Sequence, residues 1–291
     1  MPIRPLDEFV TARAHTIGDV TSSSLSSSDN RISEPEGSEG RGRIGWQIAL
    51  VLALGLGQSA IYAVVQLIDA STQPTPLADQ TTTLNPQLSD RQYFDLTYQL
   101  LDIAFSLVPV LLAAYFLWRA RRPHLDRMGL VRLRPLPDIG GGLLLALIIG
   151  AGGIGVYLGA RALGLAVGVD AAGLASYWWT IPVLLLSAAR SALQEELVVL
   201  GFLYDRLRRL GWNRWAIIVG AAVLRGSYHL YQGYGGFVGN FVMGLIFGWL
   251  YTRSRRVLPF VIAHFVIDAA VFVAYPWAAA AYPQLFGVGA H

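Results

Sequence analysis

Residues 139–158 read IGGGLLLALIIGAGGIGVYL and contain no charged side chain. A helix that crosses the hydrocarbon core of a bilayer needs about 20 apolar residues, so this run predicts a transmembrane helix inside the span 138–163. Strands of membrane barrels alternate apolar and polar residues over short segments, and this run does not alternate. The stretch therefore predicts an all-α membrane fold.

Runs of the same kind recur along the chain from residue 44 onward. Hydrophobic residues make up 54% of the chain and charged residues 14%, whereas soluble domains have about 45–50% and about 25%. We therefore predict a polytopic transmembrane helix bundle of about seven helices, in contact with membrane lipids. The expected spans are 44–68, 97–118, 138–163, 179–204, 214–232, 236–252 and 257–276.

The chain is expected to have four parts. Residues 1–43 contain a serine-rich tract and no apolar run, and such a composition is typical of a disordered polar tail. Residues 44–178 are expected to form the N-terminal transmembrane helices. Residues 179–276 are expected to form the functional core, and residues 277–291 a short C-terminal tail.

Arginine is distributed unevenly between the predicted loops. All 22 basic residues are arginine, and the loops on one side hold thirteen of them whereas those on the other side hold only Arg91. Because cytoplasmic loops carry the excess of positive charge, this bias predicts a cytoplasmic N-terminus and an extracytoplasmic C-terminus. The arginine-rich loops are 119–134, 206–214 and 253–256, and the arginine-poor ones are 70–96, 164–178, 233–237 and 277–291.

Two sequence features are expected to have no binding role. The string from Gly150 to Gly155 fits GxGxxG, but a dinucleotide site requires a strand before that string and a soluble βαβ unit around it. We assign these glycines, and the pair Gly244 and Gly248, to close helix packing. The net charge of +3 is too small to indicate a nucleic-acid partner, and the absence of cysteine excludes a thiolate nucleophile.

The informative residues are the charged and titratable ones inside the spans. A charge at mid-depth costs about 2.5–3.5 kcal/mol on insertion scales, so a cluster of charges indicates a function. Asp102 and Arg190 are interpreted as structural partners, and Asn240 as a helix cap or packing group. The others fall on three late spans and are Glu195, Glu196, Arg225, His229, His264 and Asp268.

The spacing of these residues predicts one shared polar pocket. His264 and Asp268 are four residues apart and lie on one helix face, whereas Glu195 and Glu196 point about 100° apart, so each needs its own surroundings. A carboxylate and an imidazole can activate water, and a second imidazole can stabilise an oxyanion. Alternatively, His229, His264 and Glu195 are suitable ligands for Zn²⁺, and the sequence leaves both routes open.

These motifs resemble those of the CAAX protease and bacteriocin-processing (CPBP) family of intramembrane endopeptidases, which includes the type II CAAX prenyl endopeptidases. The family pattern is EExxxR, then FxxxH, then HxxxN or HxxxD on transmembrane helices. The resemblance covers about residues 179–276 and implies that Glu195 and His229 activate water. It also implies that His264 and Asp268 stabilise the oxyanion, with or without a divalent metal such as Zn(II).

Two residues depart from the family pattern. Leu200 occupies the arginine position of the first motif, and Arg225 occupies the phenylalanine position of the second. A buried carboxylate without a cation is unfavourable, so we expect Arg225 to pair with Glu196 as the supporting cation.

The sequence therefore predicts an intramembrane endopeptidase that acts on a membrane-associated protein or peptide. Two other functions remain open. A proton-coupled transporter also places charged side chains at mid-depth, although no inverted repeat is evident. The second is a non-catalytic scaffold or immunity protein derived from the same family.

Overall fold

The computed structural model describes residues 40–117, 129–130, 133–171 and 173–282. The chain divides into two units, residues 1–38 and 39–291, and all of the described residues belong to the second unit. Most of the predicted tail and most of the arginine-rich loop 119–134 lie outside the described residues.

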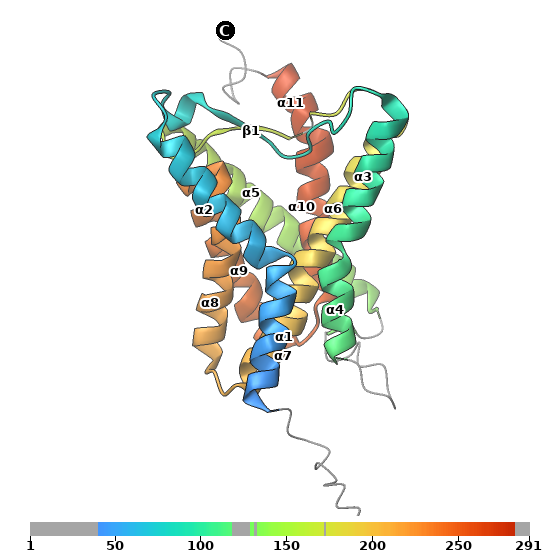
Figure 1. The fold of residues 1–291 in the computed structure, drawn as a ribbon, viewed down its shortest axis with the longest axis vertical. Coiled ribbons are helices and arrows are strands. Elements are labelled where there is room, and N and C mark those ends of the chain that lie inside the picture. The colour runs from blue at the N-terminus through green and yellow to red at the C-terminus, as the bar shows by residue number, and fades with distance from the viewer. Residues whose placement is uncertain (1–39, 118–128, 131–132, 172, 283–291) are drawn as a thin grey trace, which may run out of the picture. The chain divides into compact units, whose positions relative to one another are not determined.

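The described part of the chain is almost entirely helical and confirms the all-α class (Figure 1). Its α-helices are α1 (Arg41–Ala53), α2 (Leu56–Thr72), α3 (Gln92–Ser106), α4 (Val108–Leu117), α5 (Gly141–Ala162), α6 (Thr180–Glu196), α7 (Tyr204–Arg209), α8 (Arg214–Ser227), α9 (Tyr234–Ser254), α10 (Leu258–Ala269) and α11 (Tyr275–Ala281). Short 3₁₀ turns are η1 (Leu77–Asp79) and η5 (Leu230–Gln232), and π-helical segments are η3 (Pro135–Gly140), η4 (Leu197–Leu203) and η6 (Ala270–Ala274).

Four helical segments of the described chain are long and apolar enough to cross a membrane, or five if the bent pair α1–α2 is one span. The predicted count of seven is therefore not confirmed. The helices α6 and α8 lie within two of the predicted spans but are not among these segments. They have 17 and 14 residues, and they carry Glu195, Glu196 and Arg225, the charged residues that interrupt their apolar character.

The first predicted span, 44–68, is two helices instead of one. The axes of α1 and α2 differ by 54°, and Gly55 at the break has φ −153° and ψ −113°, outside helical geometry. An added Cβ at Gly55 would lie 3.1 Å from the side chains of both Gln194 and Pro109. The bend therefore brings the first span against α6 and α4.

The centre of the bundle is formed by the second half of the chain. The π segment η4 continues α6 into α7, and its residues Val198 and Phe202 are fully buried. They belong to one hydrophobic core with Ile218 of α8, Phe247 of α9 and Phe260 of α10. The same core includes Val51 of α1 and Ala113 of α4, and its packing holds the charged residues of the predicted pocket in fixed relative positions.

Two short strands join the arginine-poor loops at one end of the bundle. The strand β1 (Thr81–Thr83) pairs in parallel with β2 (Gly168–Asp170), and Ala166 forms a bridge with Gly233. The loops 70–96, 164–178 and 233–237 therefore meet, as their predicted location on one side of the membrane requires. The arginine-rich segments meet at the opposite end, where Arg256 pairs with Asp138, and this hydrogen bond raises the pKa of Arg256.

The two glycine motifs have different surroundings. Gly244 supports close packing, because an added Cβ would lie 2.9 Å from the backbone of Ala222 on α8. The packing interpretation is wrong for Gly152, Gly153 and Gly155, which have no other described atom within 4 Å of an added Cβ. They lie on α5, whose span is only 11% buried inside the bundle, so these glycines face outward.

Candidate active site

The predicted pocket residues come together where the end of α6 meets the end of α8 and the middle of α10. Glu195 and Glu196 are the last two residues of α6, and the helix continues as the π segment η4. A second π segment, η6, begins two residues after Asp268. Such π segments often occur at functional sites, and here each follows a carboxylate of the cluster.

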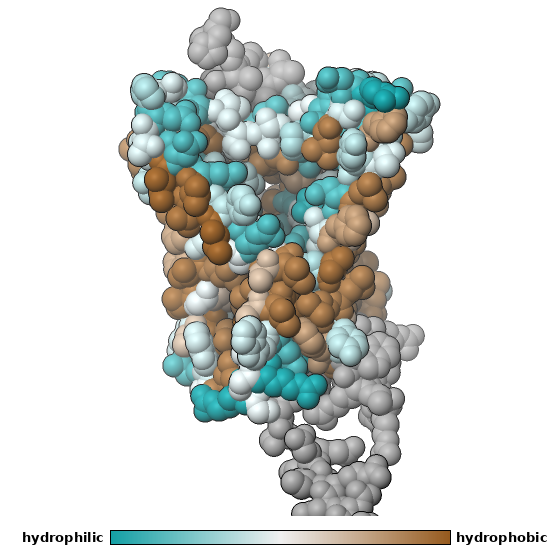
Figure 2. Space-filling view, in the orientation of Figure 1, coloured by the Kyte–Doolittle hydropathy of each residue, from teal (hydrophilic) through white to brown (hydrophobic). Residues whose placement is uncertain are grey.

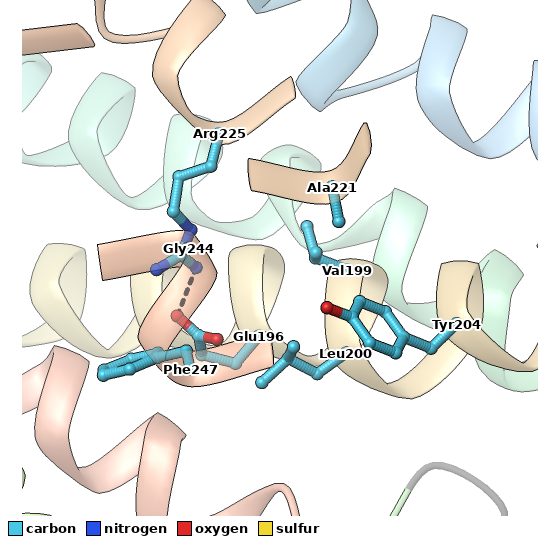
Figure 3. Close-up of a pocket in the computed structure, with 8 residues that line it drawn as sticks. All are labelled: Glu196, Val199, Leu200, Tyr204, Ala221, Arg225, Gly244 and Phe247. Atoms are coloured by element: carbon cyan, nitrogen blue, oxygen red, sulfur yellow. Dashed lines mark hydrogen bonds and ion pairs between the residues drawn. The ribbon is translucent and has the colours of Figure 1, made fainter. Parts of the chain in front are cut away.

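Glu196 lies at the base of the site and is completely buried. Its Oε1 accepts a hydrogen bond from Nη2 of Arg225, as Figure 3 shows, and lies 2.8 Å from Nδ1 of His264. Its Oε2 is buried and has no hydrogen-bond partner in the part of the chain that the structure describes. The pairing of Arg225 with Glu196 expected from the sequence is therefore present, and it links α6, α8 and α10 at one carboxylate.

Arg225 occupies the space beside Leu200, the residue at the family's arginine position. Its side chain is only 2% exposed, and it lines a small pocket with Glu196, Leu200, Tyr204 and Phe247 (Figure 3). The guanidinium of Arg225 also lies 5.5 Å from the centre of the Phe247 ring, a cation–π distance. A cation from α8 thus neutralises the buried carboxylate of α6, while the apolar side chain of Leu200 occupies the family's arginine position on η4.

Glu195 has two different oxygen environments. Its Oε2 accepts a 2.7 Å hydrogen bond from the hydroxyl of Tyr228, and lies 3.6 Å from Nη2 of Arg225 and 3.9 Å from Nε2 of His229. No described residue donates to Oε1, which is not among the buried unpartnered atoms. One oxygen is therefore held by the protein, and the other is neither held by a described donor nor fully buried.

His229 lies just beyond α8, although it falls inside the predicted helical span 214–232. The helix ends at Ser227, and His229 precedes the 3₁₀ turn η5. Gly226 allows this ending, because an added Cβ there would lie 2.8 Å from the ring of Phe237 on α9. Both ring nitrogens of His229 are buried and have no hydrogen-bond partner among the described residues, and Nε2 lies 3.9 Å from Oε2 of Glu195.

His264 lies between two carboxylates on α10 and α6. Its Nδ1 faces Glu196, and its Nε2 lies 3.5 Å from Oδ2 of Asp268, one turn later on the same helix. The side chain of His264 is 6% exposed and that of Asp268 is 19% exposed. The predicted i,i+4 relation is therefore present, and Nε2 is the nitrogen directed toward the more exposed part of the site.

The three residues that the sequence offered as zinc ligands do not converge on one point. His229 contacts Glu195, while both ring nitrogens of His264 face other carboxylates, those of Glu196 and Asp268. Within the described residues, no group of three or more His, Asp or Glu side chains is arranged to hold a metal ion. The residues present therefore do not fit a metal centre in this arrangement.

Tyr228 is the site residue that sequence reasoning missed. Its side chain is 5% exposed, and its ring centre lies 4.9 Å from that of His229. Its position three residues after Arg225 was an available signal, because residues three apart share a helix face. A buried tyrosine hydroxyl needs a partner, and here that partner is Glu195.

A polar hollow lies on the face of the bundle between α2 and α3. In Figure 1, α6 and α10 are seen between these two helices, and Figure 2 shows hydrophilic side chains inside the hollow and hydrophobic ones on the surfaces around it. The outward residues of the flanking helices include Ile61, Tyr62 and Val65 on α2, and Tyr98, Leu101 and Phe105 on α3. A hollow with a polar interior and an apolar outer rim is suited to a substrate that arrives through the bilayer.

The comparison with known families agrees with the resemblance seen in the motifs. Residues 177–270 match the model of the type II CAAX prenyl endopeptidase Rce1-like family. No curated protein and no solved structure matches the chain. The matched segment contains all six of the charged and titratable residues that the sequence singled out, and it runs from the start of α6 to the end of α10. Residues 177–270 of the membrane bundle are therefore similar to the type II CAAX prenyl endopeptidase Rce1-like family.

Proposed function

We propose that this protein is an intramembrane endopeptidase that uses Glu195 to activate water. The observation that carries the proposal is the asymmetric environment of the Glu195 carboxylate, with Oε2 bonded to Tyr228 and Oε1 neither bonded to a described donor nor fully buried. A carboxylate held in this way can take a proton from a water molecule only on its open side. The family match supports protease chemistry at this site.

The neighbouring residues have roles that follow from their contacts. As water attacks the peptide carbonyl, Glu195 accepts its proton and then delivers that proton to the leaving amine. His229, with its unpartnered nitrogens, orients the water or the substrate carbonyl. Glu196, 2.8 Å from Nδ1, orients the ring of His264. Nε2 lies 3.5 Å from Asp268, beyond a close hydrogen bond, and donates to the oxyanion when substrate is bound. Glu196 and Arg225 form the buried pair that holds His264 in place.

The substrate class follows from the position of the site. Glu195 and His264 lie within the helix bundle rather than in a loop, so we propose a membrane-associated protein or peptide as the substrate. Membrane lipids are the other expected partners, and no nucleic acid is expected. We also propose, from the arginine distribution, that the N-terminus is cytoplasmic and the C-terminus extracytoplasmic.

A comparison of membrane proteomes tests the proposed function. Membranes from cells that produce the wild-type protein are expected to contain new peptide termini that are missing with Glu195→Ala. Asp102→Asn is the matched control, because Asp102 is an exposed carboxylate on α3 away from the site. Identical termini in the wild-type and Glu195→Ala samples would support a scaffold or transporter instead.

Tyr228→Phe is expected to lower kcat about tenfold or more and to leave KM nearly unchanged. The substitution keeps the buried ring but removes a hydrogen bond to a charged group, worth about 1.5–3 kcal/mol, so Glu195 loses its fixed orientation. Tyr251→Phe is the control, because Tyr251 is equally buried and packs against Tyr204 and Phe260 away from Glu195. Equal kinetics for both variants would show that the Tyr228 hydroxyl has no positioning role.

Single introduced cysteines test the orientation, since the chain has none of its own. Ser71 is exposed at the end of α2, and Arg208 is exposed on α7 near the opposite end. An impermeant thiol reagent added to intact cells is expected to label Ser71→Cys and not Arg208→Cys. Labelling of Arg208→Cys alone would reverse the proposed orientation.

Chelation tests the proposal that the reaction needs no metal. We expect activity to survive treatment with a strong chelator, because Glu195 can activate water directly and His264 faces other carboxylates. The measurement is turnover and bound metal content before and after treatment. About one Zn²⁺ per chain, lost together with activity and restored with it, would contradict the metal-free route.

A further inference from the structure

Arg190 on α6 differs from the other inward-facing arginines of the bundle. Its Nε is buried and has no hydrogen-bond partner, and no ion pair joins Arg190 to any residue that the structure describes. By contrast, Arg225 pairs with Glu196 and Arg256 pairs with Asp138. Since a cation inside a membrane protein is costly without a partner, the unpaired guanidinium of Arg190 indicates a ligand.

The direction of Arg190 is given by Gln194, which lies one turn later on the same face of α6. The Nε2 of Gln194 lies 3.1 Å from the position of an added Cβ on Gly55, so this face of α6 looks toward the α1–α2 bend. Arg190 lies one turn closer to the end of the bundle that holds β1 and β2. In Figure 1, α6 is seen between α2 and α3, the two helices that flank the hollow.

Arg190 and the catalytic carboxylate border the same space. The hydroxyl of Tyr231, in the turn η5, is close enough to Arg190, Glu195 and Asp268 to interact electrostatically with all three. The terminal nitrogens of Arg190 are not among the buried unpartnered atoms. They are therefore accessible from the side on which a substrate must approach Glu195.

We propose that Arg190 binds a carboxylate of the peptide substrate. This inference rests on the proposed endopeptidase function and adds a determinant of its specificity. A guanidinium can hold a carboxylate through two parallel hydrogen bonds, and it cannot lose its charge in a protein. The carboxylate is either an acidic side chain or the C-terminal carboxylate of the substrate.

The position of this carboxylate along the substrate follows from helix geometry. Arg190 precedes Glu195 by five residues, which is about 7.5 Å along the helix at 1.5 Å per residue. An extended peptide advances about 3.3 Å per residue, so the bound carboxylate lies about two or three residues from the cleaved bond. Cleavage sites are therefore expected at a fixed distance from a negative charge.

A library of short synthetic peptides tests this inference without knowledge of the natural substrate. Purified protein in lipid nanodiscs is incubated with equimolar peptides, and cleavage sites are identified by mass spectrometry. The wild-type protein is expected to prefer bonds about two or three residues from a carboxylate, since that is the span between Arg190 and Glu195. A second library with amidated C-termini distinguishes the two sources, because only a preference for the C-terminal carboxylate is lost on amidation.

Arg190→Gln is expected to reduce this preference about tenfold, the effect of losing a charge-assisted hydrogen bond, while cleavage of peptides without a nearby carboxylate continues. Arg190→Lys is expected to retain part of the preference. Arg214→Gln, which removes an exposed arginine at the start of α8, is the control and is expected to behave as wild type.

An unchanged preference in Arg190→Gln, or no preference in the wild type, would overturn the assignment and leave the endopeptidase function intact. A wild-type protein that cleaves no more peptides than Glu195→Gln would instead refute the endopeptidase function, and the assignment of Arg190 with it.

Discussion

Replacing Glu195 by glutamine is expected to remove nearly all peptide hydrolysis, a loss of about 10²–10⁴-fold that is typical for a missing general base. Glutamine has nearly the same size and still accepts the hydrogen bond from Tyr228, so the fold is expected to persist. It cannot take a proton from water. The expected result is thus a folded and inactive protein, measured by turnover of peptides in lipid nanodiscs and by thermal unfolding.

The double variant of Glu195→Gln and His229→Ala separates catalysis from binding. Members of one catalytic unit fail together, so the second substitution is expected to add little to the first. The separation of 3.9 Å between His229 Nε2 and Glu195 Oε2 makes such coupling physically reasonable. Losses that multiply in the double variant would assign the two residues to independent roles.

Arg225→Phe is expected to lower the free energy of unfolding by about 3–5 kcal/mol, as for other buried ion pairs that lose one partner. The substitution restores the residue type of the family pattern at this position but leaves the buried carboxylate of Glu196 without its cation. Activity is expected to fall together with stability, because Glu196 also contacts His264. Thermal unfolding and turnover in the same lipid preparation measure both effects.

Adding Leu200→Arg to Arg225→Phe is expected to restore a measurable part of both stability and activity. Leu200 lines the same pocket as Glu196 and Arg225 (Figure 3). An arginine at position 200 can therefore approach the Glu196 carboxylate from η4, the segment that continues α6. Leu200→Arg alone is the control and is expected to be harmful, because it buries a second cation beside the first. A harmless Arg225→Phe would show that Glu196 needs no cation.

The sequence predicted the contact between Arg225 and Glu196 because both residues are charged and lie in apolar surroundings. Such groups have few possible partners, and the two departures from the family pattern, Leu200 and Arg225, reduced the choice further. The same reasoning did not find Tyr228, because it considered the carboxylates, arginines and histidines of the spans and no tyrosine. The spacing of three residues from Arg225 was an available signal, but the hydrogen bond to Glu195 on α6 is a tertiary contact that this spacing does not reveal.

The membrane spans were predicted less well than the pocket, for a related physical reason. Runs of apolar residues identify α5 and α9 directly. They do not distinguish one straight helix from two bent ones, as with α1 and α2 at Gly55, where the bend depends on Gln194 and Pro109 of other helices. They also do not show which glycines of α5 face the bundle, because a glycine-rich pattern looks the same whether the glycines contact another helix or face lipid.

Hydrolysis in ¹⁸O-labelled water by the purified protein tests the central claim most directly. The account predicts that the wild-type protein in nanodiscs cleaves library peptides and places one ¹⁸O atom in each new carboxyl terminus. Glu195→Gln is predicted to form no such product, whereas Asp102→Asn is predicted to form the same products as wild type. Labelled products of equal yield from Glu195→Gln, or no product from the wild type, would contradict the account.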